Sequence, residues 1–219
     1  MRGQNPKRAP EHGDGNTLSV VEIFPTLQGE GPHAGVPAIF VRLGGCNLAC
    51  NFCDTQFEDF SEMAIRDVLA GVTALKKAHP LVVITGGEPL RQPIAPLCEA
   101  LLASGFQVQI ETNGTIFREL PDAVDVICSP KAVDGTYYPL RPDMLARVSA
   151  LKFLISAHDS AYGHVPEVEQ STRSVPIYVQ PMDEYDAAKN AENTRLCVEL
   201  CQRHGYRLSL QTHKILGIA

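Results

Sequence analysis

The clearest chemical signal in the sequence is a set of three closely spaced cysteines. Cys46, Cys50 and Cys53 have the spacing C-x3-C-x2-C and follow directly on an apolar run of the length and composition of a strand. Three thiolates in one wrapped loop can converge and hold three corners of an iron–sulfur cluster. A cubane with three protein ligands leaves one iron open for a substrate or cofactor, so we expect iron–sulfur chemistry at this loop.

Other uses of these cysteines are less consistent with the spacing. A structural zinc ion normally takes four ligands, most often as two separated pairs, and a thioredoxin-like C-x2-C pair would not need Cys46. The remaining cysteines are scattered, and we expect them to be core residues: Cys98, Cys128, Cys197 and Cys201. A non-catalytic iron–sulfur carrier or a zinc module stays an alternative at this point.

Short apolar segments and helical patterns must position this loop. Segments bounded by Gly, Pro, Ser or Asn predict strands at residues 18–24, 38–43, 81–85, 106–111, 124–128, 151–155, 177–180 and 206–211. Apolar residues at helical spacing predict helices at residues 61–79, capped by Ser61 and stopped by Pro80, near 94–104, and at 183–204. The alternation predicts an α/β fold with a mainly parallel sheet, an incomplete (β/α) barrel with reduced helical cover, because a full barrel typically needs about 250 residues.

Composition limits the class of protein further. The chain has 219 residues, with 19 Lys and Arg against 25 Asp and Glu, a net charge of −6. It lacks the basic face of a nucleic-acid binder, and it shows neither a membrane span nor a signal peptide. Seven cysteines without an export signal favour free thiols or metal ligands in a reducing cytoplasm. We expect a flexible lead-in at residues 1–16 and a single domain at residues 17–219.

Two motifs together resemble the radical S-adenosylmethionine (SAM) superfamily. The first is the cysteine triplet with Phe52 before the last cysteine, and the second is Thr85-Gly86-Gly87-Glu88-Pro89, at the end of a later predicted strand. The resemblance implies a 4Fe-4S cluster on the three cysteines. Its open iron would chelate SAM, whose reductive cleavage gives a 5′-deoxyadenosyl radical. It also implies that the Gly-Gly-Glu-Pro segment holds the amino group of SAM.

Further segments resemble the 7-carboxy-7-deazaguanine synthases of queuosine and 7-deazapurine biosynthesis. They are residues 24–31, which contain Gln28-Gly29-Glu30-Gly31, then 40–48, 53–55, 129–131 and 212–214. The resemblance implies a lyase that converts 6-carboxy-5,6,7,8-tetrahydropterin to 7-carboxy-7-deazaguanine and ammonia. Hydrogen abstraction from C6 would precede a radical ring contraction, SAM would be regenerated, and Mg2+ would be required.

Site residues follow from these motifs and from the strand ends, where barrel active sites collect. We expect SAM to contact Phe52, Gly86, Gly87, Glu88, Ser129, Pro130, Lys131, Gln180, Pro181, Met182 and Asp183. The pterin substrate would contact Leu27, Gln28, Gly29, Glu30, Arg42, Thr85 and the terminal carboxylate of Ala219. Thr55 would bind Mg2+, with Asp54 as an alternative ligand.

Several of these roles have a simpler structural alternative. Arg42 is a lone charge in an apolar run and would suit the substrate carboxylate as a bidentate partner, or it points outward on a strand face or pairs with a buried acid. Glu30 accepts hydrogen bonds from pterin N–H groups, or it is a solvated loop carboxylate. Thr55 binds the metal ion, or it only ends the loop. The apolar C-terminal tail covers the site, or it packs on the barrel or on a dimer partner.

Alternatives and partners complete the expectation. A radical SAM activase of a glycyl radical enzyme would carry the same cysteine spacing, but the segment around Gln28 and Arg42 favours a small polar substrate. We expect a flavodoxin or ferredoxin as the reductant. We also expect a homodimer, with neither nucleic acid nor a membrane as partner.

Overall fold

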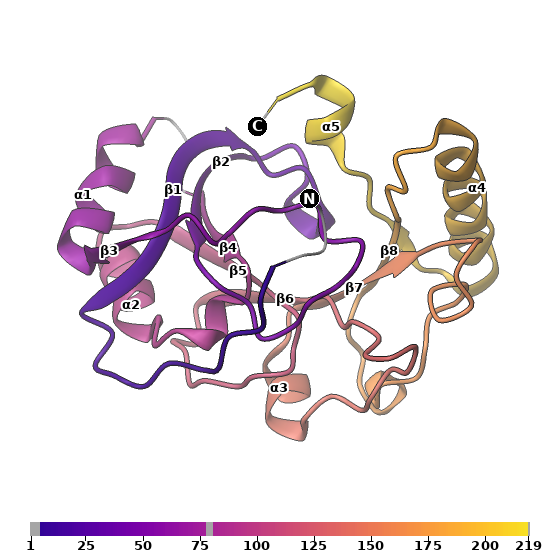
Figure 1. Ribbon diagram of the computed structural model, residues 1–219, viewed down its shortest axis with the longest axis horizontal. Coiled ribbons are helices and arrows are strands. Elements are labelled where there is room, and N and C mark those ends of the chain that lie inside the picture. Colours follow the sequence, from indigo (N-terminus) through magenta and orange to yellow (C-terminus); the bar gives the residue numbers. More distant parts are fainter. Residues whose placement is uncertain (1–4, 78–80, 219) are drawn as a thin grey trace. The chain divides into compact units, whose positions relative to one another are not determined.

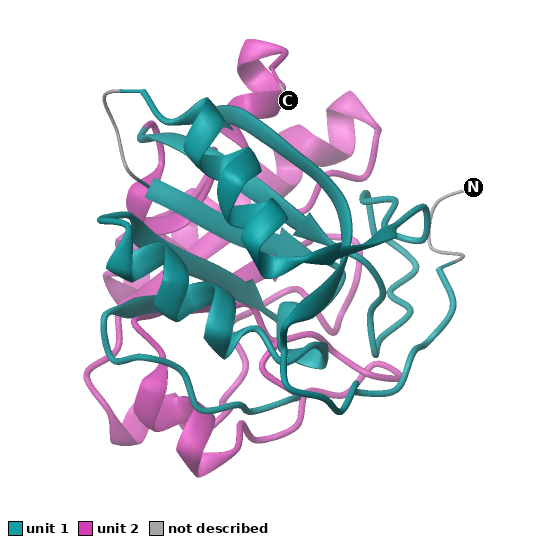
Figure 2. Cartoon of the chain, turned by 90° about the vertical axis from the view of Figure 1, so that its left-hand side faces the viewer, with its two compact units in different colours: residues 1–28, 36–112, 116–125 teal, residues 29–35, 113–115, 126–219 magenta. Residues whose placement is uncertain are grey.

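The structure, a computed structural model, describes residues 5–77 and 81–218. Its contacts divide the chain into two compact units, which Figure 2 shows in different colours. Unit 1 comprises residues 1–28, 36–112 and 116–125, and unit 2 comprises residues 29–35, 113–115 and 126–219. Each unit is described by itself, and the single domain at residues 17–219 stays a prediction.

Unit 1 contains five strands of a twisted sheet. They are β1 (Thr17–Leu27), β2 (Pro37–Leu43), β3 (Ser61–Ala64), β4 (Leu81–Gly86) and β5 (Gln107–Thr112), hydrogen-bonded in the order β3-β1-β2-β4-β5. β2, β4 and β5 run parallel, whereas β1 pairs antiparallel with both of its neighbours. The side chains of residues 81–84 in β4 are all buried, as expected for a central strand of a parallel sheet that is covered on both faces.

The helices of unit 1 cover one face of these strands. α1 (Ile65–Leu75) packs on β1, and α2 (Ala95–Ala103) packs on β5 and α1, as Figure 2 shows. Ile23 of β1 points toward α1, because its Cδ1 lies 3.2 Å from the position of a Cβ at Gly71. Side chains alternate along a strand, so the neighbouring residues of β1 and β2 point to the opposite face, which carries no helix of unit 1. Their pairing brings Glu22 opposite Arg42 and Phe24 opposite Phe40 on that face.

Unit 2 contains four parallel strands. β6 (Val124–Cys128), which begins at the unit boundary, is followed by β7 (Ala150–Ile155), β8 (Ile177–Pro181) and β9 (Arg207–Leu208). α3 (Pro142–Arg147) and α4 (Ala187–His204), both labelled in Figure 1, contribute to one apolar cluster with residues of β7 and β8. Cys197 and Leu200 of α4 pack there against Phe153 and Val179, which confirms Cys197 as a core residue. Cys201 packs against the same cluster.

The observed fold confirms the expected class and corrects several boundaries. The sheet is mainly parallel and open, as expected for an incomplete barrel. Ser61 does not cap a helix, because residues 61–64 form strand β3 and Ala64 takes the N-cap position of α1. α1 ends at Leu75, so Pro80, which lies outside the described residues, does not stop it. α4 begins at Ala187, where the Asp186 carboxylate accepts hydrogen bonds from the N–H groups of two residues in its first turn.

Other elements were not expected from the sequence. They are β3, α3, α5 (Thr212–Leu216), and the short 3-10 helices η1 (Gly31–His33), η2 (Pro89–Arg91) and η3 (Gln170–Thr172). The strand expected at residues 206–211 is shorter than predicted and is observed as β9, directly before α5. Among residues 5–77 and 81–218, no helix has both the length and the apolar character needed to cross a bilayer.

Candidate active site

The cysteine loop, residues 46–55, begins where β2 ends in unit 1. Cys46, Cys50 and Cys53 lie on this loop outside any disulfide bond, and each is partly buried. The pKa of the Cys46 thiol is raised to about 11, mainly by burial and in addition by the charges of Glu88, Cys50 and Cys53, against a hydrogen bond from the Leu48 N–H. The three thiols are therefore near enough to interact electrostatically, as the ligands of one group must be.

This donor set fits an iron–sulfur cluster. Soft sulfur donors with no nitrogen or oxygen ligand suit such a cluster, and three of them leave one iron open. In the part of the chain that the structure describes, no three His, Cys, Asp or Glu residues are arranged to hold a single metal ion. The cysteine sulfurs of a cubane bind separate irons, so they stand further apart than the ligands of one ion. Cys46, Cys50 and Cys53 would hold the cluster.

The segment at residues 86–89 contacts the start of the cysteine loop through main-chain atoms. The Gly87 N–H donates to the Leu43 carbonyl oxygen at 3.2 Å, and the Glu88 N–H donates to the Gly45 carbonyl oxygen at 3.0 Å. A Cβ at Gly87 would lie 2.0 Å from the Gly45 oxygen, so only glycine permits this approach. The two motifs that are 40 residues apart in the sequence are thus adjacent in unit 1.

Glu88 is held in a fixed orientation at this contact. Its side chain is fully buried, and its Oε1 accepts hydrogen bonds from the Leu90 N–H at 3.0 Å and the Thr112 hydroxyl at 2.7 Å. Thr112 ends β5, so two neighbouring strands orient one carboxylate. Such an oriented buried carboxylate is suited to bind a positively charged or N–H-bearing group of a cofactor.

Arg42 lies on the helix-free face of unit 1, in register with Thr85 of β4. Its Nε donates to the Glu22 carboxylate at 2.6 Å, and its guanidinium lies 5.5 Å from the centroid of the Phe24 ring. Glu22 is half-exposed and Arg42 is 21% exposed. An ion pair this accessible contributes little net stability, about 0.2–1 kcal/mol, so another carboxylate can replace Glu22 at small cost.

Gln28 and Glu111 add polar groups to unit 1. Gln28, directly after β1, is buried and donates from its amide to the Glu111 carboxylate at 3.3 Å. Gln109 donates to the same oxygen at 2.7 Å. At the end of the cysteine loop, the Thr55 hydroxyl donates to the Asp54 carboxylate at 3.2 Å, so both candidate magnesium ligands lie together.

Glu30 is the centre of a polar network in unit 2. Its carboxylate accepts hydrogen bonds from Lys152 at 2.6 Å and from Gln211 at 2.9 Å, and Gln180 donates a third. Burial alone would raise the pKa of Glu30, but the charge and hydrogen bond of Lys152 with those of Gln211 and Gln180 outweigh it and lower the pKa to about 2. Glu30 is therefore an ionised acceptor, not the solvated loop carboxylate of the alternative reading.

This ion pair predicts a pH-dependent stability. Lys152→Met leaves Glu30 buried without its cation, and we expect the free energy of unfolding at pH 7 to fall by about 3–5 kcal/mol. Because the wild-type pKa of about 2 is below the ordinary 4.5, the stabilisation is present at neutral pH and is lost as pH falls from about 4.5 to 2. In the variant, burial raises the pKa of Glu30, so the difference from wild type shrinks on acidification.

Urea unfolding of the cluster-free protein at pH 7 and pH 4 measures this difference. Lys189→Met, which removes a half-exposed lysine of unit 2, is the matched control and is expected to change the unfolding free energy by less than about 1 kcal/mol. A Lys152→Met variant as stable as wild type at pH 7 would contradict the role given to the pair.

The other candidate SAM residues occupy strand ends of unit 2. Lys131 donates to the carbonyl and hydroxyl oxygens of Ser129 at 2.6 Å each, and Pro130 between them is buried. Asp183 accepts hydrogen bonds from the Tyr185 N–H, the Asn190 amide and the Lys214 ammonium. The remaining members of that segment are the buried Gln180, Pro181 and the buried Met182. Their contacts with SAM, like that of Phe52 in unit 1, stay predictions.

The C-terminal segment lies against Gly29 and Glu30 within unit 2. The Thr212 N–H donates to the Gly29 carbonyl oxygen at 3.0 Å, and a Cβ at Gly29 would lie 2.1 Å from Nδ1 of His213. Gly29 is thus required for the approach of α5. Together with the Gln211–Glu30 bond, this supports a tail beside the site, although Ala219 itself lies outside the described residues.

Several residues of the site were not identified from the sequence. Lys152 carries the same signal as Arg42, one charged residue in an apolar run, and could have been found in this way. Gln211 stands next to a motif residue but carries no signal of its own, whereas the position of Thr112 at the end of a predicted strand already made it a candidate. Glu22 is an ordinary charged residue of a strand, and only the β1–β2 register reveals it as the partner of Arg42.

Comparisons with known proteins agree with this geometry. Residues 40–135, which contain both motifs of unit 1, match the family model of the Radical SAM superfamily. A 7-carboxy-7-deazaguanine synthase of Rickettsia prowazekii is 53% identical over 224 residues, covering 100% of this chain and 96% of that protein. The chain belongs to the 7-carboxy-7-deazaguanine synthase family. Within this family, the 7-carboxy-7-deazaguanine synthase of Rhodospirillum rubrum is 40% identical to this chain, over the full length of both proteins.

A solved structure of the family supports the fold independently. The crystal structure of QueE from Escherichia coli matches with a TM-score of 0.71 at 30% sequence identity, over 89% of this chain and 93% of that chain. As a radical SAM member of the 7-carboxy-7-deazaguanine synthase family, the chain takes a 4Fe-4S cluster and SAM as cofactors.

Proposed function

We propose that this protein converts 6-carboxy-5,6,7,8-tetrahydropterin to 7-carboxy-7-deazaguanine with release of ammonia. The observation that carries the proposal is the likeness, over the full chain, to curated 7-carboxy-7-deazaguanine synthases at up to 53% identity. The alternative of a glycyl radical activase has no comparable support. The substrate is a small molecule, and its ring contraction by hydrogen abstraction at C6 is part of the same proposal.

The residues of unit 1 would bind the cofactors side by side. When bound, the cluster supplies the electron that cleaves SAM reductively. Cys46, Cys50 and Cys53 would hold it, and Glu88, fixed by Leu90 and Thr112, would accept a hydrogen bond from the amino group of SAM. The main-chain bonds between residues 86–89 and the cysteine loop support this assignment, because they keep the two cofactor segments adjacent.

Polar groups of the residues that resemble the family's substrate segments would bind the pterin. Backbone groups of Leu27, Gln28 and Gly29 would read the donor and acceptor edge of the pterin, and Thr85 would contact it from β4. The ionised carboxylate of Glu30 would accept hydrogen bonds from pterin N–H groups. The terminal carboxylate of Ala219 would complete the site.

Arg42 would bind the substrate carboxylate in place of Glu22. The expected result is that Arg42→Gln raises the KM for the pterin about 10- to 100-fold, the effect of losing charge-assisted hydrogen bonds. Glu22→Gln removes the competing carboxylate and should lower this KM or leave it unchanged. Steady-state kinetics measure both, and Arg66→Gln, at an exposed arginine of α1, is the control. An Arg42→Gln enzyme with wild-type KM would exclude this role.

Mg2+ would bind at the end of the cysteine loop. Thr55 and Asp54 offer oxygen ligands, which Mg2+ prefers, and the substrate carboxylate and water would supply the others. We further propose that the enzyme works in the cytoplasm as a homodimer and receives its electron from a flavodoxin or ferredoxin. It needs no nucleic acid or membrane.

An anaerobic assay tests the function directly. The protein is reconstituted with iron and sulfide and supplied with dithionite, SAM, Mg2+ and 6-carboxytetrahydropterin, and the products are separated by chromatography with mass detection. Formation of 7-carboxy-7-deazaguanine supports the proposal. Slow release of 5′-deoxyadenosine without the deazaguanine would keep the radical chemistry and overturn the substrate.

A further inference from the structure

The segment at residues 5–11, here called the N-terminal arm, lies along the cysteine loop in unit 1. Lys7 forms a parallel bridge with Cys46, and the Arg8 N–H donates to the Cys46 carbonyl oxygen at 2.7 Å. At the other end of the loop, the Asn5 amide donates to the Thr55 carbonyl oxygen at 3.0 Å and lies 4.0 Å from the Cys53 sulfur. The arm therefore contacts the loop at its first and its last cysteine.

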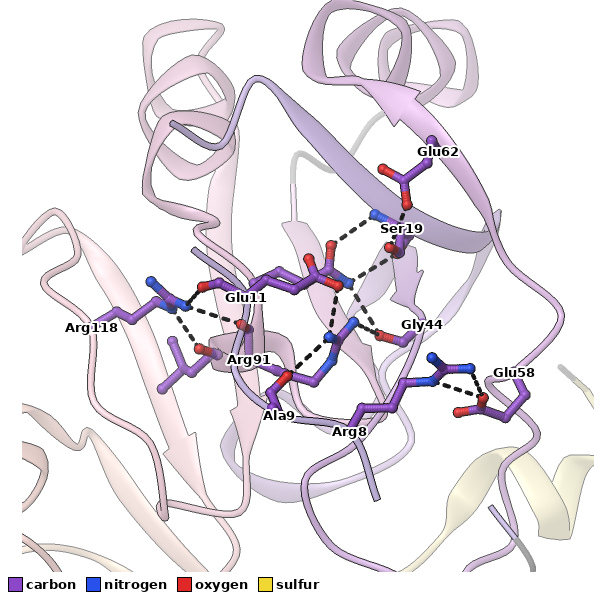
Figure 3. A network of polar contacts seen from close by, with 11 residues as sticks. Arg8, Ala9, Glu11, Ser19, Gly44, Glu58, Glu62, Arg91 and Arg118 are labelled. Carbon is purple, nitrogen blue, oxygen red and sulfur yellow. Dashed lines mark hydrogen bonds and ion pairs between the residues drawn. The ribbon is translucent and has the colours of Figure 1, made fainter. Parts of the chain in front are cut away.

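Arg91 ties the arm to the start of the loop. Figure 3 shows its guanidinium between Glu11, Ala9 and Gly44: it pairs with the Glu11 carboxylate at 2.7 Å and donates to the Ala9 and Gly44 carbonyl oxygens at 3.3 and 3.0 Å. The Arg91 side chain is only 3% exposed, so its charge depends on these partners. Arg91 lies two residues after the segment at residues 86–89, which places the arm near both cofactor motifs.

Two more arginines fix the arm at either side. The Arg118 guanidinium donates to the carbonyl oxygens of Leu90, Glu11 and Arg91. The Arg8 side chain pairs with Glu58, which follows the loop, and lies 5.2 Å from the centroid of the Phe60 ring. Figure 3 shows the bonds of Arg118 on one side of Arg91 and the Arg8–Glu58 pair on the other. Loops open by local unfolding when few such bonds hold them, so each bond lowers the population of the open loop.

We propose that the N-terminal arm is part of the cluster site: it holds the cysteine loop in the form that ligates the cluster, with Arg8, Glu11 and Arg91 as positioning residues. The sequence alone assigned no such role to residues 1–16, and their flexibility as a lead-in stays a prediction. The proposal rests on the cluster and not on the pterin substrate, so its failure is separable from that of the proposed function.

Release of iron tests the proposal in the full-length holoprotein. We expect Glu11→Gln to release iron to a chelator about tenfold faster than wild type, because it removes the charge that compensates the buried Arg91. The matched control is Glu119→Gln, the same change at an exposed residue of unit 1, which should stay within about twofold of wild type. Circular dichroism and thermal unfolding of the cluster-free proteins identify any loss of fold.

A second variant keeps the proposal testable where Glu11→Gln fails to fold. The Arg8 side chain is 42% exposed, so Arg8→Ala is expected to fold, to release iron several-fold faster, and to change the electron paramagnetic resonance spectrum of the reduced cluster with SAM bound. Arg8→Lys, which keeps the charge, should restore part of the wild-type rate, and Arg66→Ala is the control. Wild-type release rates and spectra in both the Glu11 and Arg8 variants would overturn the proposal.

Discussion

Cys50→Ala is expected to reduce formation of 7-carboxy-7-deazaguanine to below about one thousandth of the wild-type rate. The cluster is expected to have Cys46, Cys50 and Cys53 as its three protein ligands, and loss of one leaves two thiolates for a group that needs three corners held. The other two cysteines of the described loop are already in the expected ligand set, so neither can replace Cys50. The measurement combines product formation with iron content and visible absorbance after anaerobic reconstitution.

Cys201→Ala provides the matched control for this variant. Cys201 is partly buried beside the apolar cluster of unit 2 and has no part in the cysteine loop. It should keep the wild-type iron content and turnover, with a loss of stability of about 1 kcal/mol from the smaller side chain. A Cys50→Ala protein with a complete cluster and wild-type turnover would remove Cys50 from the ligand set.

Glu88→Gln is expected to raise the KM for SAM about 10- to 100-fold while the fold remains stable. Glutamine keeps the shape and the Oε1 acceptor that binds the Leu90 N–H and the Thr112 hydroxyl, while it removes the charge and replaces the other acceptor oxygen by an NH2 donor. A hydrogen bond to a charged group contributes about 1.5–3 kcal/mol, which sets the size of the effect. Equilibrium binding of SAM to the reconstituted protein, together with the KM, measures it.

Thr112→Val separates the orientation of Glu88 from its charge. Valine removes the hydroxyl that donates to Glu88 but leaves the carboxylate in place, so a smaller increase in KM is expected than for Glu88→Gln. Glu62→Gln changes an exposed carboxylate of β3 and serves as the control. Unchanged SAM affinity in Glu88→Gln would show that this carboxylate does not bind the cofactor.

The sequence predicts those parts of the site whose residues are neighbours in the chain. The cysteine spacing and the Gly-Gly-Glu-Pro segment are local patterns, and short β-branched runs mark the strands before them. β3 was missed because residues 61–64 continue into α1, and a helical pattern of apolar residues masks a short edge strand. α1 also shows that a serine before a helical pattern does not by itself make a cap.

Long-range pairings could not be predicted in the same way. Lys152 and Glu30 are 122 residues apart, and nothing near either of them specifies the other. The pairing of Glu22 with Arg42 depends on the β1–β2 register, which a bulge near Val20 shifts. The N-terminal arm has no periodic apolar pattern, so its main-chain hydrogen bonds to the cysteine loop could not be predicted from the sequence.

The contact between residues 86–89 and the cysteine loop has a consequence for substitutions elsewhere in the site. A Cβ at Gly86 would lie 2.0 Å from the Leu43 oxygen, and one at Gly87 would lie 2.0 Å from the Gly45 oxygen. Main-chain atoms therefore set the spacing of the two cofactor segments. Arg42 and Thr85, the proposed substrate contacts, lie outside these main-chain contacts, so we expect substitutions there to change substrate binding without moving the two cofactor segments.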